Sequence, residues 1–275
     1  MSLNLDAVIE APEDSVDMKA GLDTFQGVSD AVRCIAETVL TDKVPKHKTH
    51  KGKVRTTLKQ SFRGSYGLIF SVDIYDDDIK KKFVRIGREA FAELISYYLN
   101  DSIYEETRQL SDKAQKIVDK LGDQSDNLTK QIRTSALDNI HKISTTFDYN
   151  LKVRFRKNRD DQTTLAEFNK STAEVLEAKE SDERLEVIAA ITRLNINTGN
   201  GRLLISGTKD TVAFGFETEY KDIKIGAKKI FSENLDNNNG LTQDKWSYLK
   251  LVVSPITLRD GKIVKYIVKA FYNAE

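Results

Sequence analysis

The stretch LEVIAAITRLNINTGNGRLLISGTKDTVAFGFETEY, residues 185–220, contains three runs rich in aliphatic, β-branched and aromatic residues. Short polar segments that contain glycine separate these runs, and the first segment ends in Asn-Thr-Gly-Asn-Gly at residues 197–201. Apolar runs of this length bounded by turn residues are typical of β-strands joined by hairpins. We therefore expect strands at 185–196, 202–208 and 211–220.

The remainder of the chain after residue 220 adds one helix and two further strands. We expect a short helix within residues 221–239, ending at the Asn-Asn-Asn-Gly cluster of residues 237–240. Two alternating runs, 245–258 and 262–272, flank the turn residues Asp260-Gly261 and predict a last hairpin. Three strands, a helix and two strands is the element order of an OB-type barrel. We expect residues 184–275 to form a small five-stranded OB-like β-barrel.

Residues 1–180 predict a separate α+β domain. Its apolar residues recur with a period of two in some segments and at spacings of three and four in others. The expected elements are a strand at 3–10, a helix at 16–40, a hairpin of strands at 54–62 and 66–74, a helix from 76 to about 99, a long helical hairpin of 102–121 and 126–146, a strand at 151–156 and a helix at 164–179. The start of the chain thus has the order strand, helix, hairpin, helix.

Composition restricts the class of protein. The 275 residues carry 43 Lys and Arg against 42 Asp and Glu, so the net charge of +1 does not by itself indicate a nucleic-acid partner. The sequence has no apolar run of the roughly 20 residues that a membrane-spanning helix needs. Its first residues lack the basic and apolar regions of a secretory signal. The single cysteine, Cys34, fits a reducing compartment. We expect a cytoplasmic protein without membrane contact.

The sequence lacks the usual signatures of catalysis and metal binding. The Gly-x-Ser-x-Gly and phosphate-loop patterns are both absent. His47 and His50 have a spacing that could bind a metal, but they lie among lysines that repel a cation. His141 is expected at the surface or at the edge of the core. We therefore predict no catalytic residue, no metal site and no cofactor.

Two basic runs and the basic and aromatic residues of the barrel could contact nucleic acid. Lysine and arginine side chains neutralise phosphates, and aromatic rings beside a basic groove stack on bases. The same residues could equally be solvated loop residues and barrel core. The nucleic-acid-binding candidates are Lys46, Lys48, Lys51, Lys53, Arg55, Arg154, Arg156, Arg202 and Trp246.

The segments FQGVSDAVR at 25–33 and SFRGSYG at 61–67, followed by a small barrel, resemble uncharacterised two-domain bacterial proteins of unknown function. The resemblance covers most of the chain. It implies a two-domain layout and transfers no catalytic residue.

The sequence thus predicts a non-enzymatic bacterial binding or assembly module whose barrel engages a protein partner or a second copy of the chain. The alternative is a nucleic-acid-binding protein that uses the basic loops and the barrel. A third hypothesis is an enzyme of unrecognised type, which would require a pocket where several polar side chains converge.

Overall fold

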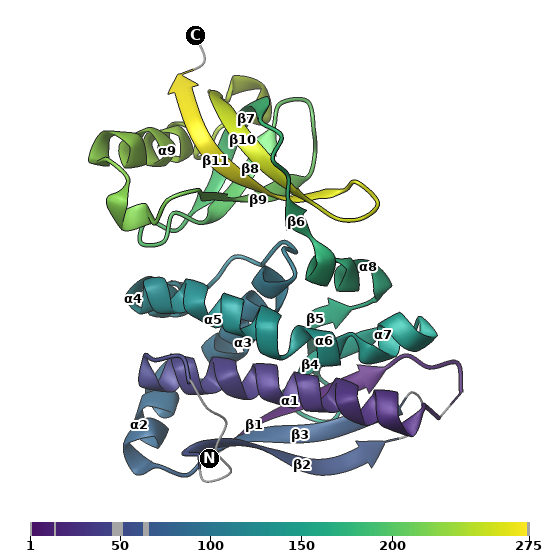
Figure 1. The fold of residues 1–275 in the computed structure, drawn as a ribbon. Coiled ribbons are helices and arrows are strands. Elements are labelled where there is room, and N and C mark those ends of the chain that lie inside the picture. Colours follow the sequence, from purple (N-terminus) through teal and green to yellow (C-terminus); the bar gives the residue numbers. More distant parts are fainter. Residues whose placement is uncertain (1, 14, 46–51, 63–65, 274–275) are drawn as a thin grey trace. The chain divides into compact units, whose positions relative to one another are not determined.

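The structure is a computed structural model that describes residues 2–13, 15–45, 52–62 and 66–273. The chain forms two compact units, Met1–Leu176 (unit 1) and Glu177–Glu275 (unit 2). Unit 1 packs helices on one face of a β-sheet, and unit 2 contains a closed five-stranded β-barrel (Figure 1). The protein is of mixed α/β class, and the prediction of a five-stranded barrel is confirmed.

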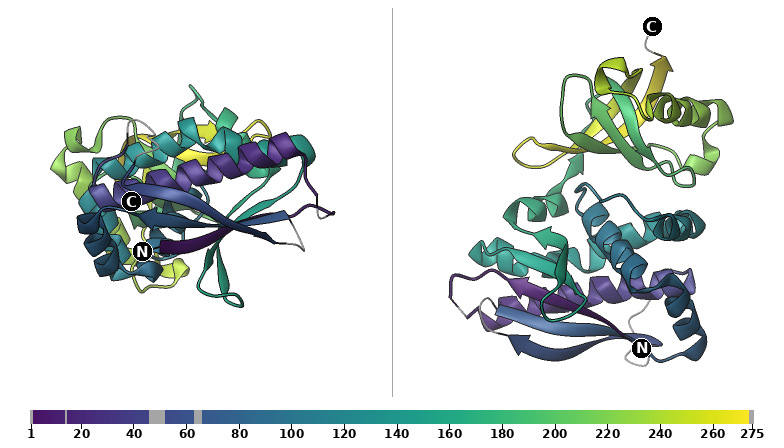
Figure 2. Two further views of the ribbon diagram at one scale, coloured as in Figure 1. Left: turned by 90° about the horizontal axis from the view of Figure 1, so that it is seen from below. Right: turned by 180° about the vertical axis from the view of Figure 1, so that it is seen from behind.

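The sheet of unit 1 has five antiparallel strands in the order β2-β3-β1-β4-β5. These strands are β1 (Ser2–Ile9), β2 (Val54–Phe62), β3 (Tyr66–Ile74), β4 (Leu151–Arg156) and β5 (Gln162–Phe168). Strand β1 is central, and its residues Leu3, Leu5, Ala7 and Ile9 are almost fully buried. Their period of two directs them to one face, which the helices of unit 1 cover (Figure 2).

The described residues of unit 1 form nine helical segments, the last of which ends one residue beyond the unit. They are α1 (Met18–Thr41), α2 (Asp77–Ile86), α3 (Arg88–Ser102), α4 (Asp112–Leu121), α5 (Asp123–Ser135), α6 (Leu137–Ile140), α7 (Lys142–Phe147), α8 (Lys170–Ala173) and the 3₁₀ helix η1 (Glu174–Glu177). Asp17 caps the start of α1, and its carboxylate accepts a hydrogen bond from the Ala20 amide at 2.8 Å. Gly27 lets α1 approach α6 closely, because a Cβ atom there would lie 2.5 Å from the Ile140 nitrogen.

The opposite face of the sheet carries a charged cluster at its centre. Asp6 points away from the helices, yet its side chain is fully buried. Arg154 on β4 lies directly opposite and donates to both carboxylate oxygens, at 2.6 and 3.1 Å, and Arg156 donates to Oδ2 at 3.3 Å. The Phe62 ring centre lies 5.9 Å from each guanidinium. The two arginines therefore join β4 to β1 and shield Asp6 from water.

Replacing Asp6 by asparagine is expected to destabilise unit 1 by roughly 3 kcal/mol, because two guanidinium groups lose the carboxylate that neutralises them. The matched control is Asp73→Asn on β3, which pairs with one lysine, Lys59, whose side chain is 46% exposed; this pair is expected to contribute at most about 1 kcal/mol. Hydrogen exchange of the β1 and β4 amides in increasing urea measures both changes. Equal effects of the two substitutions would contradict this account.

The barrel of unit 2 is closed by a ring of pairings. Strands β11, β9, β8, β7 and β10 are neighbours in that order, and β10 pairs with β11 to complete the ring. All of these pairs are antiparallel except β9 with β11. The short strand β6 (Lys179–Glu180) adds to β10. The barrel strands are β7 (Leu185–Leu194), β8 (Gly201–Ile205), β9 (Thr211–Phe216), β10 (Leu249–Thr257) and β11 (Ile263–Asn273).

Helix α9 (Ile225–Asn238) connects β9 to β10 and packs on the barrel. The fully buried Phe231 of this helix contacts Phe214 of β9, with ring centres 5.7 Å apart. Asn234 is also buried, and its Oδ1 accepts a hydrogen bond from the Ile191 amide at 2.8 Å, beside a register shift in β7. The other segments of this region are the 3₁₀ helices η2 (Tyr220–Asp222) and η3 (Gln243–Lys245).

Four helical predictions for unit 1 differ from the structure. The helix expected from 76 to about 99 is divided into α2 and α3 at Gly87, whose φ is 84°. The first arm of the expected helical hairpin, 102–121, is helical only from Asp112, and residues 103–111 form an irregular segment. The second arm is divided into α5, α6 and α7. The helix expected at 164–179 is wrong, since residues 162–168 form strand β5. Pairing with β4 determines this strand, and a helical spacing of apolar residues cannot reveal that partner.

Candidate functional site

The candidate site is a groove between helix α3 and strand β5, at the edge of the unit 1 sheet. Leu165 forms a bulge in β5, because Val153 pairs with Ala166 and the next residue of β4, Arg154, pairs with Thr164. The Leu165 carbonyl oxygen instead accepts hydrogen bonds from two side chains of α3. Ser96 Oγ donates to it at 2.6 Å and Asn100 Nδ2 at 2.8 Å. These bonds fix α3 against the strand.

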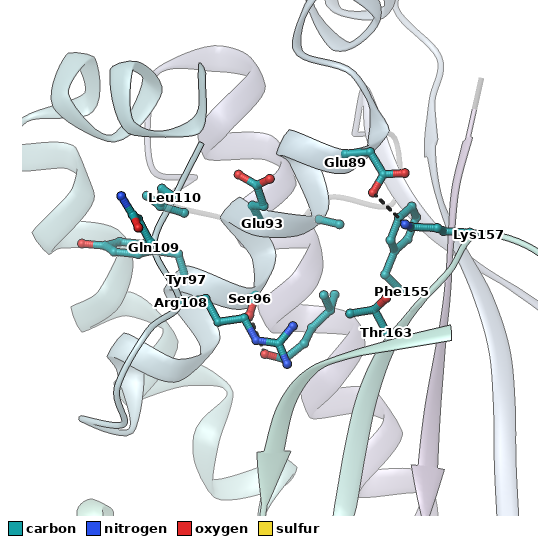
Figure 3. Close-up of a pocket in the computed structure, with 12 residues that line it drawn as sticks. Glu89, Glu93, Ser96, Tyr97, Arg108, Gln109, Leu110, Phe155, Lys157 and Thr163 are labelled. Carbon is teal, nitrogen blue, oxygen red and sulfur yellow. Dashed lines mark hydrogen bonds and ion pairs between the residues drawn. The ribbon is translucent and has the colours of Figure 1, made fainter. Parts of the chain in front are cut away.

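The groove has a wider and a narrower part, and both lie wholly within unit 1. The wider part has a volume of about 430 Å³ and follows β5 from Thr164 to Glu167. The narrower part has a volume of about 160 Å³ and includes the apolar side chains of Ala92, Leu110 and Phe155. Both parts share Ser96, Leu165 and Arg108, and Figure 3 shows the Arg108 side chain extending toward Ser96. The groove thus combines an apolar end with a polar end.

The irregular segment 103–111 forms one wall of the groove and is held by Arg133 of α5. Arg133 Nε donates to the Ser102 carbonyl at 2.8 Å, and Nη2 donates to the Asp101 carbonyl at 2.7 Å. Its guanidinium carbon lies 3.9 Å from the ring centre of Tyr104, a residue with the left-handed φ of 61°. A left-handed aromatic residue is costly and persists only when its surroundings hold it. Arg133 therefore terminates α3 and directs the following segment along the groove.

Replacing Arg133 by alanine is expected to release segment 103–111, because two charge-assisted hydrogen bonds and one cation–π contact are lost. A loss of about 2 kcal/mol corresponds to roughly 30-fold faster hydrogen exchange in this segment. Arg133→Lys, which keeps the charge without the planar fork, should give an intermediate rate. The matched control is Lys130→Ala on the exposed side of α5. Unchanged exchange in Arg133→Ala would refute the positioning role of Arg133.

His141 supports the far end of the groove through Thr172. The ring is fully buried, contrary to the expectation of a surface or edge position. Since the Leu137 carbonyl can only accept, Nδ1 carries the proton and donates to it at 2.8 Å, which leaves Nε2 to accept from Thr172 Oγ1 at 2.9 Å. Burial lowers the pKa of His141 from 6.5 to about 4, against the opposing effects of the Leu137 hydrogen bond and the Asp138 charge.

The stability of unit 1 is therefore expected to decrease as the pH falls from about 6.5 to about 4. In this window the unfolded imidazole binds a proton that the folded one does not, so folding is favoured at higher pH. The full effect is up to roughly 3 kcal/mol for one group. Urea unfolding across this pH range, followed by hydrogen exchange of unit 1 amides, should show a pH slope that His141→Gln reduces by close to one proton. An identical slope in the two proteins would contradict the lowered pKa.

The predicted nucleic-acid-binding residues that the structure describes belong to both units, and each contacts neighbours within its own unit. Lys46, Lys48 and Lys51 lie outside the described residues. Arg154 and Arg156 lie together on β4, and both bind Asp6. The remaining candidates contact neighbours in their own unit: Lys53 with Asp76 at 2.7 Å, Arg55 over the Tyr75 ring at 4.1 Å, Arg202 with Thr211 at 2.7 Å and Trp246 with the Leu241 carbonyl at 3.0 Å.

The groove residues were not among the residues predicted from the sequence. Ser96 and Asn100 lie within a helix, Arg108 lies in a segment expected to be helical, and Leu165 lies in the segment wrongly predicted as a helix. A spacing of four between Ser96 and Asn100 does place them on one helical face, which is the one available signal. Their shared partner is 65 residues beyond Asn100.

The described residues contain no cluster of three or more His, Cys, Asp or Glu side chains that could hold a metal ion. Within the same residues, no helix combines the length and apolarity needed to cross a membrane. Comparison of the chain with protein-family models, curated proteins and solved structures finds no match.

Proposed function

We propose that this protein is a non-enzymatic binding module that engages a protein partner, and that an extended segment of the partner lies in the groove along β5. The observation that carries this proposal is the position of the groove. Strand β5 has β4 as its one strand neighbour in the described sheet, and the wider part of the groove follows its other edge. Sheet edges bind extended peptides through main-chain hydrogen bonds, and adjacent pockets provide specificity.

The chemistry of the lining supports binding rather than catalysis. Ser96 donates its hydroxyl proton to the Leu165 carbonyl, so its oxygen is not activated by a base. Glu93 accepts hydrogen bonds from the amide and hydroxyl groups of Ser111, at 3.0 and 2.6 Å, and thereby anchors the wall of the groove. Groups engaged in this way shape a surface. The converging polar side chains that an enzyme would need are present, but these two contacts favour a structural role for them.

Nucleic-acid binding remains the alternative, and the connectivity of unit 2 favours it. The antiparallel meander β7-β8-β9, the helix α9 before β10 and the parallel pairing of β9 with β11 support an OB-like assignment. OB-type barrels commonly bind single strands. Against it, Arg202 and Trp246 already have partners within unit 2. Binding of single-stranded probes that weakens steeply with salt and upon changing Lys48, Lys51 and Lys53 to glutamate would favour this alternative.

The proposal is tested by panning a phage-displayed library of random peptides against the full chain. Enriched peptides should bind at least about tenfold more weakly to Ser96→Trp, because the indole fills both parts of the groove. Ser232→Trp on α9 is the matched control, since it introduces the same bulk at a half-buried helical serine outside the groove. Circular dichroism checks that both variants are folded.

A second measurement uses only the unmodified protein, so its result does not depend on whether Ser96→Trp folds. In the unmodified protein, a bound peptide should slow hydrogen exchange in β5 and in segment 103–111. A library that enriches no peptide would refute the proposal. Peptides that bind without protecting these two segments would refute the assignment to the groove.

A further inference from the structure

The charges that line the groove indicate what kind of segment it accepts. Five glutamates line its two parts, and they face one arginine and one lysine. These residues are Glu89, Glu93, Glu105, Glu106, Glu167, Arg108 and Lys157. We infer that the occupant is a basic extended polypeptide, with a lysine or arginine in the wider part of the groove and an apolar side chain in the narrower part. This inference rests on the proposed function.

Three of the five glutamates already have partners. Glu89 lies 3.6 Å from Lys157, Glu93 binds Ser111, and Glu167 lies 3.7 Å from Lys152. Lysines thus compensate the charges of Glu89 and Glu167, and the carboxylate of Glu93 is engaged by two hydrogen-bond donors. They contribute little to the recognition of a ligand, because an added cation would have to compete with these contacts.

Glu105 and Glu106 differ from the other three. Both are exposed on segment 103–111, and within the described residues neither carboxylate has a hydrogen-bond or ion-pair partner. The Glu105 amide donates to the Asn100 carbonyl at 3.0 Å, which ties the start of this pair to the end of α3. Arg133 anchors the segment that carries these two adjacent carboxylates. The two carboxylates can therefore form ion pairs with cationic side chains of a bound segment.

The two parts of the groove differ in charge. The wider part contains Glu105, Glu106 and Glu167 against Arg108, whereas the narrower part balances Glu89 and Glu93 with Arg108 and Lys157. The narrower part also contains the apolar side chains of Ala92, Leu110, Phe155 and Leu165. A cation is accordingly favoured in the wider part and an apolar side chain in the narrower part. Arg108, at the junction, can donate to main-chain carbonyls of the segment.

The test uses the full chain and three labelled octapeptides in which lysine, glutamine or glutamate alternates with valine. Fluorescence anisotropy should show the tightest binding for the lysine peptide and the weakest for the glutamate peptide. The preference for lysine should diminish as salt is added, because the two carboxylates are exposed. Glu105→Gln together with Glu106→Gln should weaken binding of the lysine peptide by roughly fourfold to 25-fold, since each exposed ion pair contributes about two- to fivefold.

Two controls isolate the charge effect. Glu183→Gln together with Glu233→Gln removes the same charge from exposed positions in unit 2 and should leave the affinity for lysine peptide unchanged. Glu105→Lys together with Glu106→Lys should reverse the preference toward the glutamate peptide.

The possible outcomes separate this inference from the proposed function. If the glutamine peptide binds as tightly as the lysine peptide, or if the library enriches only acidic groove-binding peptides, the inference is overturned while the binding function stands. If no octapeptide binds and the library enriches none, both fail.

Discussion

The bulge at Leu165 determines how the candidate site of unit 1 is built. A strand residue without a counterpart on the neighbouring strand must satisfy its carbonyl oxygen elsewhere, and Ser96 and Asn100 of α3 provide the donors. This requirement fixes α3 at the edge of the sheet and leaves a groove beside β5. Arg133 then binds the carbonyls at the end of α3 and directs segment 103–111 along the opposite wall.

Charged residues on the open face of the unit 1 sheet pair with one another, whereas those at the edge beside β5 are partly unpaired among the described residues. On the face away from the helices, Arg154 and Arg156 are used to compensate the buried carboxylate of Asp6, so two cations that resemble a phosphate-binding pair serve the sheet itself. At the edge of the sheet, Glu105 and Glu106 remain exposed without such partners among the described residues. The charges available for recognition are therefore acidic in the groove, although the sequence drew attention to the basic runs.

The structure of unit 2 depends on closing a barrel of five strands and on filling its core. The pairing of β10 with β11 closes the ring, and Phe214 and Phe231 occupy the interior. Asn234 supplies the acceptor that the Ile191 amide needs beside the register shift of β7. Asn238 belongs to the cluster predicted to end this helix, yet α9 extends to it, and its buried side chain forms hydrogen bonds with the backbone of Ser247.

The sequence by itself determined the features that depend on local patterns. Period-two alternation in β1, β10 and β11, the helical spacing in α1 and the glycine turns between barrel strands all follow from residues close together in the chain. Only the tertiary structure decided that residues 162–168 pair with β4, that segment 103–111 leaves the helical path and that Ser96, Arg108 and Leu165 share a groove. These features depend on partners tens of residues away, and a local apolar pattern contains no information about which distant segment supplies the hydrogen bond.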